Sequence, residues 1–539
     1  MKIKSILIVG GGSSGWMTAS FMSKFFAEDD IKISLVESDS VPTVGVGEST
    51  IGSINNYFQL LGLEDEEWMP YCNGTYKNSI RFTDFKEIGH EIEYPFGGNY
   101  NLPDSIMTWG KVAAIVDDLD HHSFTEFHNE NTYLARFNRC TKNEKGYIDG
   151  FNFRHETAYH FNAGQLGQFL KEKICIPSGV EHHYDDIVGT EKDEDGYVTS
   201  VVGKSGKYSA DLYVDCTGFK SVLLEQEMGS KFLSYKPWLS NDSALATHIP
   251  YVDKETEIRN ETNCTAIENG WVWNIPLWNE IGTGYVYSSD FVDDETAEKE
   301  FRKHLARDPR FEKRAKEAEV RKINIRHGIR ENGWVKNVVG VGLSYAFVEP
   351  LESTSLISTH SIVLRLCDII KDRNFNCNQY DIDCHNYASR NELDGFRDFV
   401  AMHYAMGTRE DTPYWKFQTR RKLVGLAHEV EDFKNIYDVS VNNMVAFKDS
   451  FEACVFGNMM NKRWTIQTTG WNYIQAGFGY KPLTKHFMKI LIEDHPEVLE
   501  EVQETFNQWI KHREEVIEYV KTLPSHHEFL KEHIYKNGN

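Results

Sequence analysis

The sequence predicts an α/β protein, because strand-like and helical segments alternate in its first part and helical segments dominate its last part. The first 37 residues form one predicted β-α-β unit. Short apolar segments in the middle of the chain predict further strands, and from about residue 355 apolar residues recur at helical spacing. No internal repeat, low-complexity tract or flexible linker interrupts the chain. We therefore expect its parts to be interleaved in one compact body.

The predicted β-α-β unit starts at the N-terminus. Residues 4–9 are apolar enough for a buried parallel strand. The glycine-rich segment 10–15 follows, and a helix is predicted from Trp16 onward. The second strand, 31–36, ends at Glu37.

Later segments predict the rest of the architecture. Residues 198–202 and 211–214 alternate like strands of a smaller sheet, and 338–342 predicts another short apolar strand. Long charged helices are predicted within 485–535.

The domain boundaries follow from this order of elements. We expect residues 1–360 to form a nucleotide-binding module with an interleaved, substrate-facing insertion at about 80–160. Residues 361–539 are expected to form a mainly helical C-terminal lobe packed against that module.

The charge balance excludes several classes of partner. The 539 residues carry 58 Lys+Arg against 81 Asp+Glu, a net charge of −23. Such a chain is repelled by nucleic acid and by anionic membranes. No apolar run approaches the roughly 20 residues that a membrane-spanning helix needs, and the first residues lack the pattern of a signal peptide. We expect neither a nucleic acid nor a membrane partner.

The cysteines indicate a reducing compartment. There are nine, an odd number, and no two are spaced as in a Cys-x-x-Cys zinc or redox motif. Scattered cysteines of this kind are typical of cytoplasmic proteins with free thiols. We expect no disulfide framework, no metal site and a cytoplasmic location.

The segment 10–15 has the spacing of a dinucleotide-binding fingerprint, Gly10-x-Gly12-x-x-Gly15, between a strand and a helix. Gly10 allows a tight turn, Gly12 lets backbone amides approach a pyrophosphate, and Gly15 lets the helix pack close to the strand. The helix N-terminus adds unpaired N–H groups and a positive dipole end. The alternative is a glycine-rich turn of an α/β protein that binds no nucleotide.

The acidic residue after the second strand restricts the nucleotide. Glu37 lies 22 residues after Gly15, where a carboxylate accepts hydrogen bonds from a ribose hydroxyl and repels a 2′-phosphate. FAD or NAD therefore fits, and NADP does not. Two later strand-to-turn segments, 211–218 and 340–350, favour FAD. The predicted fold is α/β: an FAD-binding Rossmann-like domain of the flavin monooxygenase type, with a smaller sheet and a mainly helical substrate-binding lobe.

Several motifs along nearly the whole chain carry a resemblance to a known family. Trp-x-Trp-x-Ile-Pro at 271–276 is the most specific, although two indoles on one side of a strand would by themselves indicate core packing. The chain resembles the flavin-dependent halogenases of the tryptophan halogenase family. The other segments on which this resemblance rests are 10–17, 45–50, 76–77, 347–354, 397–399 and 403–404.

The resemblance implies an enzyme that uses FADH2, O2 and a halide ion to make hypohalous acid, which then halogenates an electron-rich aromatic substrate. Lys77 matches the family's catalytic lysine, which hydrogen-bonds the oxidant or forms a haloamine. Glu352 matches its catalytic carboxylate, which stabilises the arenium cation and takes up its proton. Without the resemblance, Lys77 would be assigned to the solvated surface.

The resemblance also implies binding residues. Thr354 and Ser355 match the family's halide positions. Ser353 and Thr354 lie at a predicted helix start, where free backbone N–H groups suit a halide. Ordinary N-capping by Ser353 and Thr354 is the alternative, and the two can hold together because capping uses only some of the free donors. The family usually has glycine at the position of Ser355, so the preferred halide stays open. The expected cofactor-binding residues are Gly10, Gly12, Ser13, Ser14, Gly15, Glu37, Glu48, Val188, Leu343 and Leu356.

The substrate end departs from members of the family that act on free tryptophan. Those members hold the ammonium group of the amino acid with an acidic residue, but residues 453–491 contain no acidic residue here. We therefore expect a simple indole, a phenol or a heteroaromatic compound, and free tryptophan stays open. Phe451, Phe456 and Trp464 form an aromatic sandwich for that substrate or belong to the core.

The sequence also bears on the partners of the protein and on alternative functions. The chain has no second nucleotide fingerprint, so a separate flavin reductase is expected to supply FADH2. A homo-oligomer is possible. The second hypothesis is an FAD-dependent aromatic monooxygenase that inserts a hydroxyl group, and the third is a non-catalytic flavin-binding protein.

Overall fold

The computed structural model describes most of the chain. The longer described segments are residues 1–40, 47–97, 119–141, 156–420 and 492–536. Shorter pieces are 109, 112–113, 115–116, 147–148, 151–152, 473–474 and 476–479. Among the helices described there, none has both the length and the apolar character to cross a membrane.

The predicted β-α-β unit is present at the N-terminus. Strand β1 (Ser5–Val9), helix α1 (Ser13–Phe25) and strand β2 (Lys32–Glu37) follow one another. They belong to a six-stranded sheet of order β10-β2-β1-β14-β23-β22. The five strands from β10 (Glu181–Tyr184) to β23 (Val338–Gly340) are parallel, and β22 (Trp334–Val335) pairs antiparallel at the edge. The apolar run of β1 is buried at four of its five residues, as a central parallel strand requires.

One predicted strand lies in a different sheet from the expected one. The smaller sheet is present as β11 (Ile187–Lys192), β12 (Val198–Gly203) and β13 (Lys207–Tyr208). The segment predicted at 211–214, however, is β14 (Leu212–Asp215), which pairs in parallel with β1 in the six-stranded sheet. The reason is burial: all four residues of β14 are buried, whereas a strand of a small surface sheet exposes one face.

A seven-stranded sheet, which the sequence analysis did not predict, forms the other half of the protein. All of its pairings are antiparallel except that of β17 with β5. Strands β5 and β6 come from the segment expected to be an insertion. The order is β20 (Arg321–Asn324), β16 (Ser243–Pro250), β19 (Glu280–Tyr287), β18 (Gly270–Pro276), β17 (Glu261–Ile267), β5 (Ser79–Thr83) and β6 (Glu91–Pro95).

Two small sheets connect these halves. Strand β9 (Ala158–Phe161) lies between β3 (Glu48–Ser49) and β4 (Thr75–Lys77), antiparallel to both. The second small sheet has the order β15-β21-β24, from Phe232–Ser234, Gly328–Arg330 and Ala346–Phe347.

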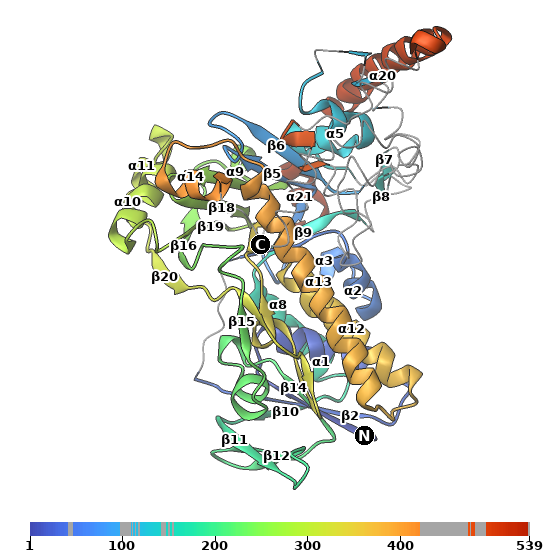
Figure 1. The fold of residues 1–539 in the computed structure, drawn as a ribbon, viewed down its shortest axis with the longest axis vertical. Coiled ribbons are helices and arrows are strands. Elements are labelled where there is room, and N and C mark those ends of the chain that lie inside the picture. The colour runs from blue at the N-terminus through green and yellow to red at the C-terminus, as the bar shows by residue number, and fades with distance from the viewer. Residues whose placement is uncertain are drawn as a thin grey trace.

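Helices dominate the last part of the described chain, as the sequence predicted. Helix α12 (Ser355–Asp372) packs against α1, and α13 (Gln379–Ala405) packs against α12. Figure 1 shows the six-stranded sheet at one end of the molecule and the seven-stranded sheet toward the other, with α13 running between them. Helices α14 (Pro413–Arg420), α20 (Glu497–Thr522) and α21 (His526–His533) follow.

The remaining helices and strands are short. The largest buried apolar cluster includes side chains of both large sheets, for example Ile8 and Phe82, so the two halves share a core. These shorter elements are α2 (Ile54–Leu61), α3 (Asp65–Trp68), α5 (Ser123–His128), α6 (Asn131–Arg136), β7 (Tyr147–Ile148), β8 (Phe151–Asn152), α8 (Ala163–Phe169), α9 (Lys254–Glu257), α10 (Asp294–Leu305) and α11 (Glu312–Glu317).

Candidate active site

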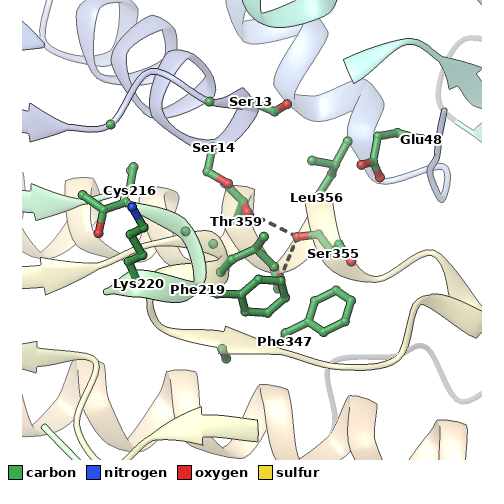
Figure 2. Close-up of a pocket in the computed structure, with 18 of the residues that line it drawn as sticks. Ser13, Ser14, Glu48, Cys216, Phe219, Lys220, Phe347, Ser355, Leu356 and Thr359 are labelled. Carbon is green, nitrogen blue, oxygen red and sulfur yellow. Dashed lines mark hydrogen bonds between the residues drawn. The ribbon is translucent and has the colours of Figure 1, made fainter. Parts of the chain in front are cut away.

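A cavity of about 850 Å³ runs from the glycine-rich turn toward the inner side of the seven-stranded sheet. Its walls come from the turn after β1, the turn after β14 and the segment that leads into α12. Figure 2 shows Ser13 and Ser14 on one side of it, Phe219 and Phe347 on another, and Glu48 beside Leu356. Nine of the ten expected cofactor-binding residues line this cavity; the exception is Gly15, which lies behind the turn.

The three fingerprint glycines differ in what an added side chain would meet. Gly10 has a φ of +109°, and a Cβ there would lie 2.4 Å from the carbonyl oxygen of Cys216. A Cβ on Gly15 would lie 1.9 Å from the carbonyl oxygen of Gly10. A Cβ on Gly12 would meet no atom within 4 Å, so this position faces open space. Gly10 and Gly15 are needed to form the turn, whereas Gly12 leaves room for a ligand.

Glu37 is held in place by two residues that the sequence did not reveal. Its Oε1 atom accepts hydrogen bonds from Lys171 Nζ at 3.1 Å and from His182 Nε2 at 2.8 Å. Burial, followed by the charge of Lys171, lowers the pKa of His182, so the ring donates as a neutral imidazole. The other oxygen, Oε2, is directed at the turn, since a Cβ on Gly11 would lie 1.6 Å from it. An open turn with a fixed carboxylate beside it fits the pyrophosphate and ribose of a dinucleotide.

Lys77 lies on β4 and its side chain is fully buried. Its Nζ atom donates hydrogen bonds to the carbonyl oxygen of Thr50 at 2.7 Å and to Oγ of Ser353 at 2.9 Å. Burial lowers the pKa of Lys77 to about 7, although Cys264 and Glu352 oppose this shift. Ammonium and neutral amine are therefore both populated near neutral pH.

Glu352 ends the short 3₁₀ turn Pro350–Glu352 and is buried. Its Oε1 atom lies 2.6 Å from Nε2 of His403, whose Nδ1 lies 2.9 Å from the carbonyl oxygen of Phe399. A carbonyl oxygen only accepts, so Nδ1 of His403 donates to Phe399. Glu352 and His403 therefore form a close, buried pair of side chains.

Ser353 connects the cavity with Lys77. It lines the cavity and also accepts the hydrogen bond from Lys77. Its backbone is left-handed, with φ +57° and ψ 35°, an uncommon conformation for a residue other than glycine. This bend ends the 3₁₀ turn and lets α12 start two residues later.

The first turn of α12 faces the cavity at the expected halide residues. Thr354 is the N-cap, and within the part of the chain that the structure describes its side chain makes no capping hydrogen bond. Ser355 is the first helical residue, and its carbonyl accepts from the hydroxyls of Ser358 at 2.8 Å and Thr359 at 3.2 Å. Capping by Thr354, the alternative considered for this position, is therefore not realised. The N–H groups at this helix start suit an anion.

The two tryptophans of 271–276 line the same cavity. The indole Nε1 of Trp271 donates to Oε1 of Glu349 at 2.5 Å, and Asn241 and Tyr404 donate to the same oxygen. The ring of Trp273 lies 6.3 Å from that of Trp271. Both indoles are thus fixed walls of the cavity.

The expected substrate residues Phe451, Phe456 and Trp464 lie outside the described residues. Nothing in the sequence indicated that His160 and Thr262 lie near the buried lysine, or that His403 is the partner of Glu352. Only His403 belonged to a motif, and nothing in its local sequence indicated a carboxylate partner.

Comparisons with known proteins extend over nearly the whole chain. The family model described as tryptophan halogenase matches residues 5–494. Tryptophan 6-halogenase SttH of Streptomyces toxytricini is 36% identical over 450 residues, which cover 80% of this chain and 83% of the relative. A solved structure titled "VirX1 apo structure" is 42% identical with a TM-score of 0.86, covering 99% of this chain and 100% of that one. The solved structure of BrvH, a flavin-dependent halogenase from Brevundimonas sp. BAL3, is 28% identical with a TM-score of 0.80, covering 98% of this chain and 99% of that one.

Proposed function

The chain belongs to the tryptophan halogenase family, and on that premise we propose that Lys77 and Glu352 are the residues with which it halogenates an electron-rich aromatic substrate. It is a flavin-dependent halogenase, and its relatives do not favour the aromatic hydroxylase considered as the second hypothesis. The observation that carries the proposal is the buried Lys77, which Ser353 links to the cavity of the dinucleotide fingerprint.

FAD is the cofactor that the family implies, and the fingerprint end of the cavity is where we place it. The N-terminus of α1 and the open position at Gly12 bind the pyrophosphate, and Glu37 accepts from a ribose hydroxyl. The reduced cofactor, with O2 and a halide ion, supplies hypohalous acid. The first turn of α12, at Thr354 and Ser355, holds the halide through backbone N–H groups and the helix dipole.

Lys77 acts on the oxidant. Within the described part of the chain its hydrogen bonds go to Thr50 and Ser353 and its Nζ lies 4.9 Å from the centre of the Phe96 ring, so one N–H of the ammonium can polarise hypohalous acid. In the neutral form, which a pKa of about 7 makes accessible, the amine instead attacks the halogen of hypohalous acid. The bond between oxygen and halogen breaks, the hydroxide that leaves takes a proton from nitrogen to become water, and a haloamine remains. The lowered pKa is needed only for the second route, which uses the neutral amine.

Glu352 acts on the substrate ring. Its carboxylate stabilises the arenium cation that follows attack on the halogen, and it accepts the proton that restores aromaticity. His403 supports this role by its position, because its Nε2 lies 2.6 Å from Oε1 of Glu352 and both side chains are buried.

The substrate class, the reductase partner and the location in the cell are also proposals. A simple indole, phenol or heteroaromatic substrate is supported by the absence of acidic residues from 453 to 491. Free tryptophan is the second candidate, because SttH is named for that substrate. A separate flavin reductase is supported by the single nucleotide fingerprint, and a cytoplasmic location by the free thiols of all eight described cysteines.

A substrate screen tests the function directly. The protein is combined with a flavin reductase, FAD, NADH and either chloride, bromide or iodide, and is offered indoles, phenols, heteroaromatics and free tryptophan. Mass spectrometry should detect halogenated products that are absent when Lys77→Met replaces the wild-type protein. Hydroxylated products without any halogenated product would instead support the monooxygenase.

A further inference from the structure

A chain of buried hydrogen bonds starts at a backbone carbonyl and ends at Lys77. At its far end, the hydroxyl of Thr75 donates to the carbonyl oxygen of Pro276 at 2.6 Å. That hydroxyl has only one proton, so it must accept from its other neighbour, Nδ1 of His160, at 3.2 Å. Nδ1 of His160 therefore carries the proton.

This tautomer sets the direction of the next bond. A neutral imidazole has a single N–H, so Nε2 of His160 accepts, and the hydroxyl of Thr262 at 2.8 Å must donate to it. His160 stays neutral because burial, together with the charges of Lys77 and His526, holds its pKa well below the usual range.

Three hydroxyls then continue the chain, and we call Thr262, Ser49 and Ser353 the hydroxyl relay. Because Thr262 has given its proton to His160, it accepts from Ser49 at 2.7 Å. Ser49 in turn accepts from Ser353 at 3.1 Å. Ser353 has then donated its only proton to Ser49, so its oxygen accepts a hydrogen bond from Nζ of Lys77 at 2.9 Å. All three relay residues are buried.

We propose that His160 is a positioning residue of the halogenation site: it holds the hydroxyl relay in one direction, so that the relay presents a lone pair to Lys77. The proposal rests on the catalytic role proposed for Lys77. It adds a residue from β9 that touches neither the cavity nor the reacting atoms.

The direction of the relay has two consequences. Each hydroxyl points its oxygen toward Lys77, which stabilises the ammonium in a buried site where desolvation opposes it. The hydroxyl of Ser353, which lines the cavity, is also prevented from donating to an anion there. The other titratable groups that face Lys77 are Glu352 from the 3₁₀ turn and Cys264 from β17. His526 of α21 faces His160.

The decisive variant is Thr262→Val, which keeps the side-chain shape and removes the hydroxyl that links His160 to Ser49. Without that acceptor, Ser49 turns its proton toward Ser353, and the relay loses its direction. The pKa of Lys77 should fall by about one unit, the scale of a weakened hydrogen bond to a charged group.

The measurement does not require turnover. Cyanate carbamoylates only neutral amines, and its reactive acid is a small neutral molecule of the kind that must reach Lys77 in the proposed mechanism. The pH dependence of Lys77 carbamoylation, followed by peptide mass spectrometry and normalised to the exposed Lys313, gives the pKa. An unchanged pKa in Thr262→Val would overturn the proposal. If no aromatic compound is halogenated but this titration shifts, the proposed function fails and the relay stands.

Matched variants separate positioning from packing. His160→Gln keeps an acceptor near the position of Nε2, so the pKa of Lys77 should stay close to its value in the wild type. His160→Leu removes that acceptor and should lower the pKa of Lys77 as Thr262→Val does. Thr247→Val removes another buried threonine hydroxyl of the seven-stranded sheet, one that donates to the carbonyl of His248, and should leave the pKa of Lys77 unchanged.

A second readout is the yield of halogenated product per FADH2 oxidised. In Thr262→Val the pH midpoint of this yield should move down by the same amount as the pKa of Lys77. Equal shifts in Thr247→Val and Thr262→Val would contradict the inference.

Discussion

The two ends of the cavity are built in opposite ways. At the fingerprint end, one continuous segment of six residues makes the turn, and close contacts with backbone explain Gly10 and Gly15. At the other end, Lys77 from β4, Glu352 from a 3₁₀ turn and His403 from α13 come from three distant parts of the chain. The first end depends on local backbone geometry. The second depends on burial and on partners that only folding brings together, and burial there lowers the pKa of Lys77 to about 7.

The largest expected effect is at the buried end. Lys77→Met keeps an unbranched side chain of similar length and removes the amine. Formation of halogenated product should fall about 10³-fold, within the range for loss of an acid–base or nucleophilic group. Oxidation of FADH2, measured in the same samples, should continue, since Lys77 acts after it. Normal product formation in this variant would contradict the mechanism.

Glu352→Gln tests the second residue at that end. The amide keeps the volume but cannot neutralise a cation or accept its proton, so turnover should fall roughly 10²-fold. The KM for the aromatic substrate should change little, because the cation exists only after attack. Steady-state kinetics of product formation measure both values. A rise in KM with unchanged turnover would assign Glu352 to substrate binding.

The pH dependence of stability tests the burial of Lys77. Its pKa is about 7 in the folded protein and about 10.4 in an unfolded chain. Between these values the unfolded chain binds more protons, so the contribution of Lys77 to the free energy of unfolding rises with pH. Relative to Lys77→Met, the wild type should gain about 2 kcal/mol of stability between pH 7 and pH 9. Denaturant unfolding of both proteins at several pH values measures this; equal pH slopes would mean that Lys77 is solvated.

A pair of glycine variants tests the fingerprint end. A side chain on Gly12 projects into open space where the pyrophosphate is expected, so Gly12→Val should weaken FAD binding about tenfold or more while the melting temperature stays the same. Gly15→Val meets the carbonyl of Gly10 and should lower the melting temperature instead. Flavin titration and thermal unfolding separate the two effects. Unchanged FAD affinity in Gly12→Val would argue against this placement of the cofactor.

The smallest effect is expected at Ser355, where the two ends meet. Ser355→Gly restores the more usual family residue and removes only a Cβ and a hydroxyl at the start of α12. The ratio of rates among chloride, bromide and iodide should change by about threefold, an energy below 1 kcal/mol. Competition assays with mixed halides measure this ratio. If Glu352→Gln shifts the ratio and Ser355→Gly does not, the roles along this segment are assigned wrongly.

The sequence was sufficient to predict the β-α-β unit, the helical last part and the family, because each depends on a local pattern. It placed 211–214 in the wrong sheet, since four alternating residues do not reveal that both faces of β14 are covered. It also missed the seven-stranded sheet, whose strands come from 79 to 324 and whose parallel pair β17–β5 joins segments about 180 residues apart.

At the site, the sequence alone determined the glycine turn and, through family motifs, made Lys77 and Glu352 the candidate catalytic residues. Only the tertiary structure decided their chemistry. The pKa of Lys77 falls because folding removes water from around it, and Glu352 has a close partner because α13 brings His403 within 2.6 Å of it. His160 reaches Lys77 through hydroxyls from three separate segments, and no spacing along the chain encodes that path. Desolvation and hydrogen-bond direction are properties of the packed site, so they appear only once the chain has folded.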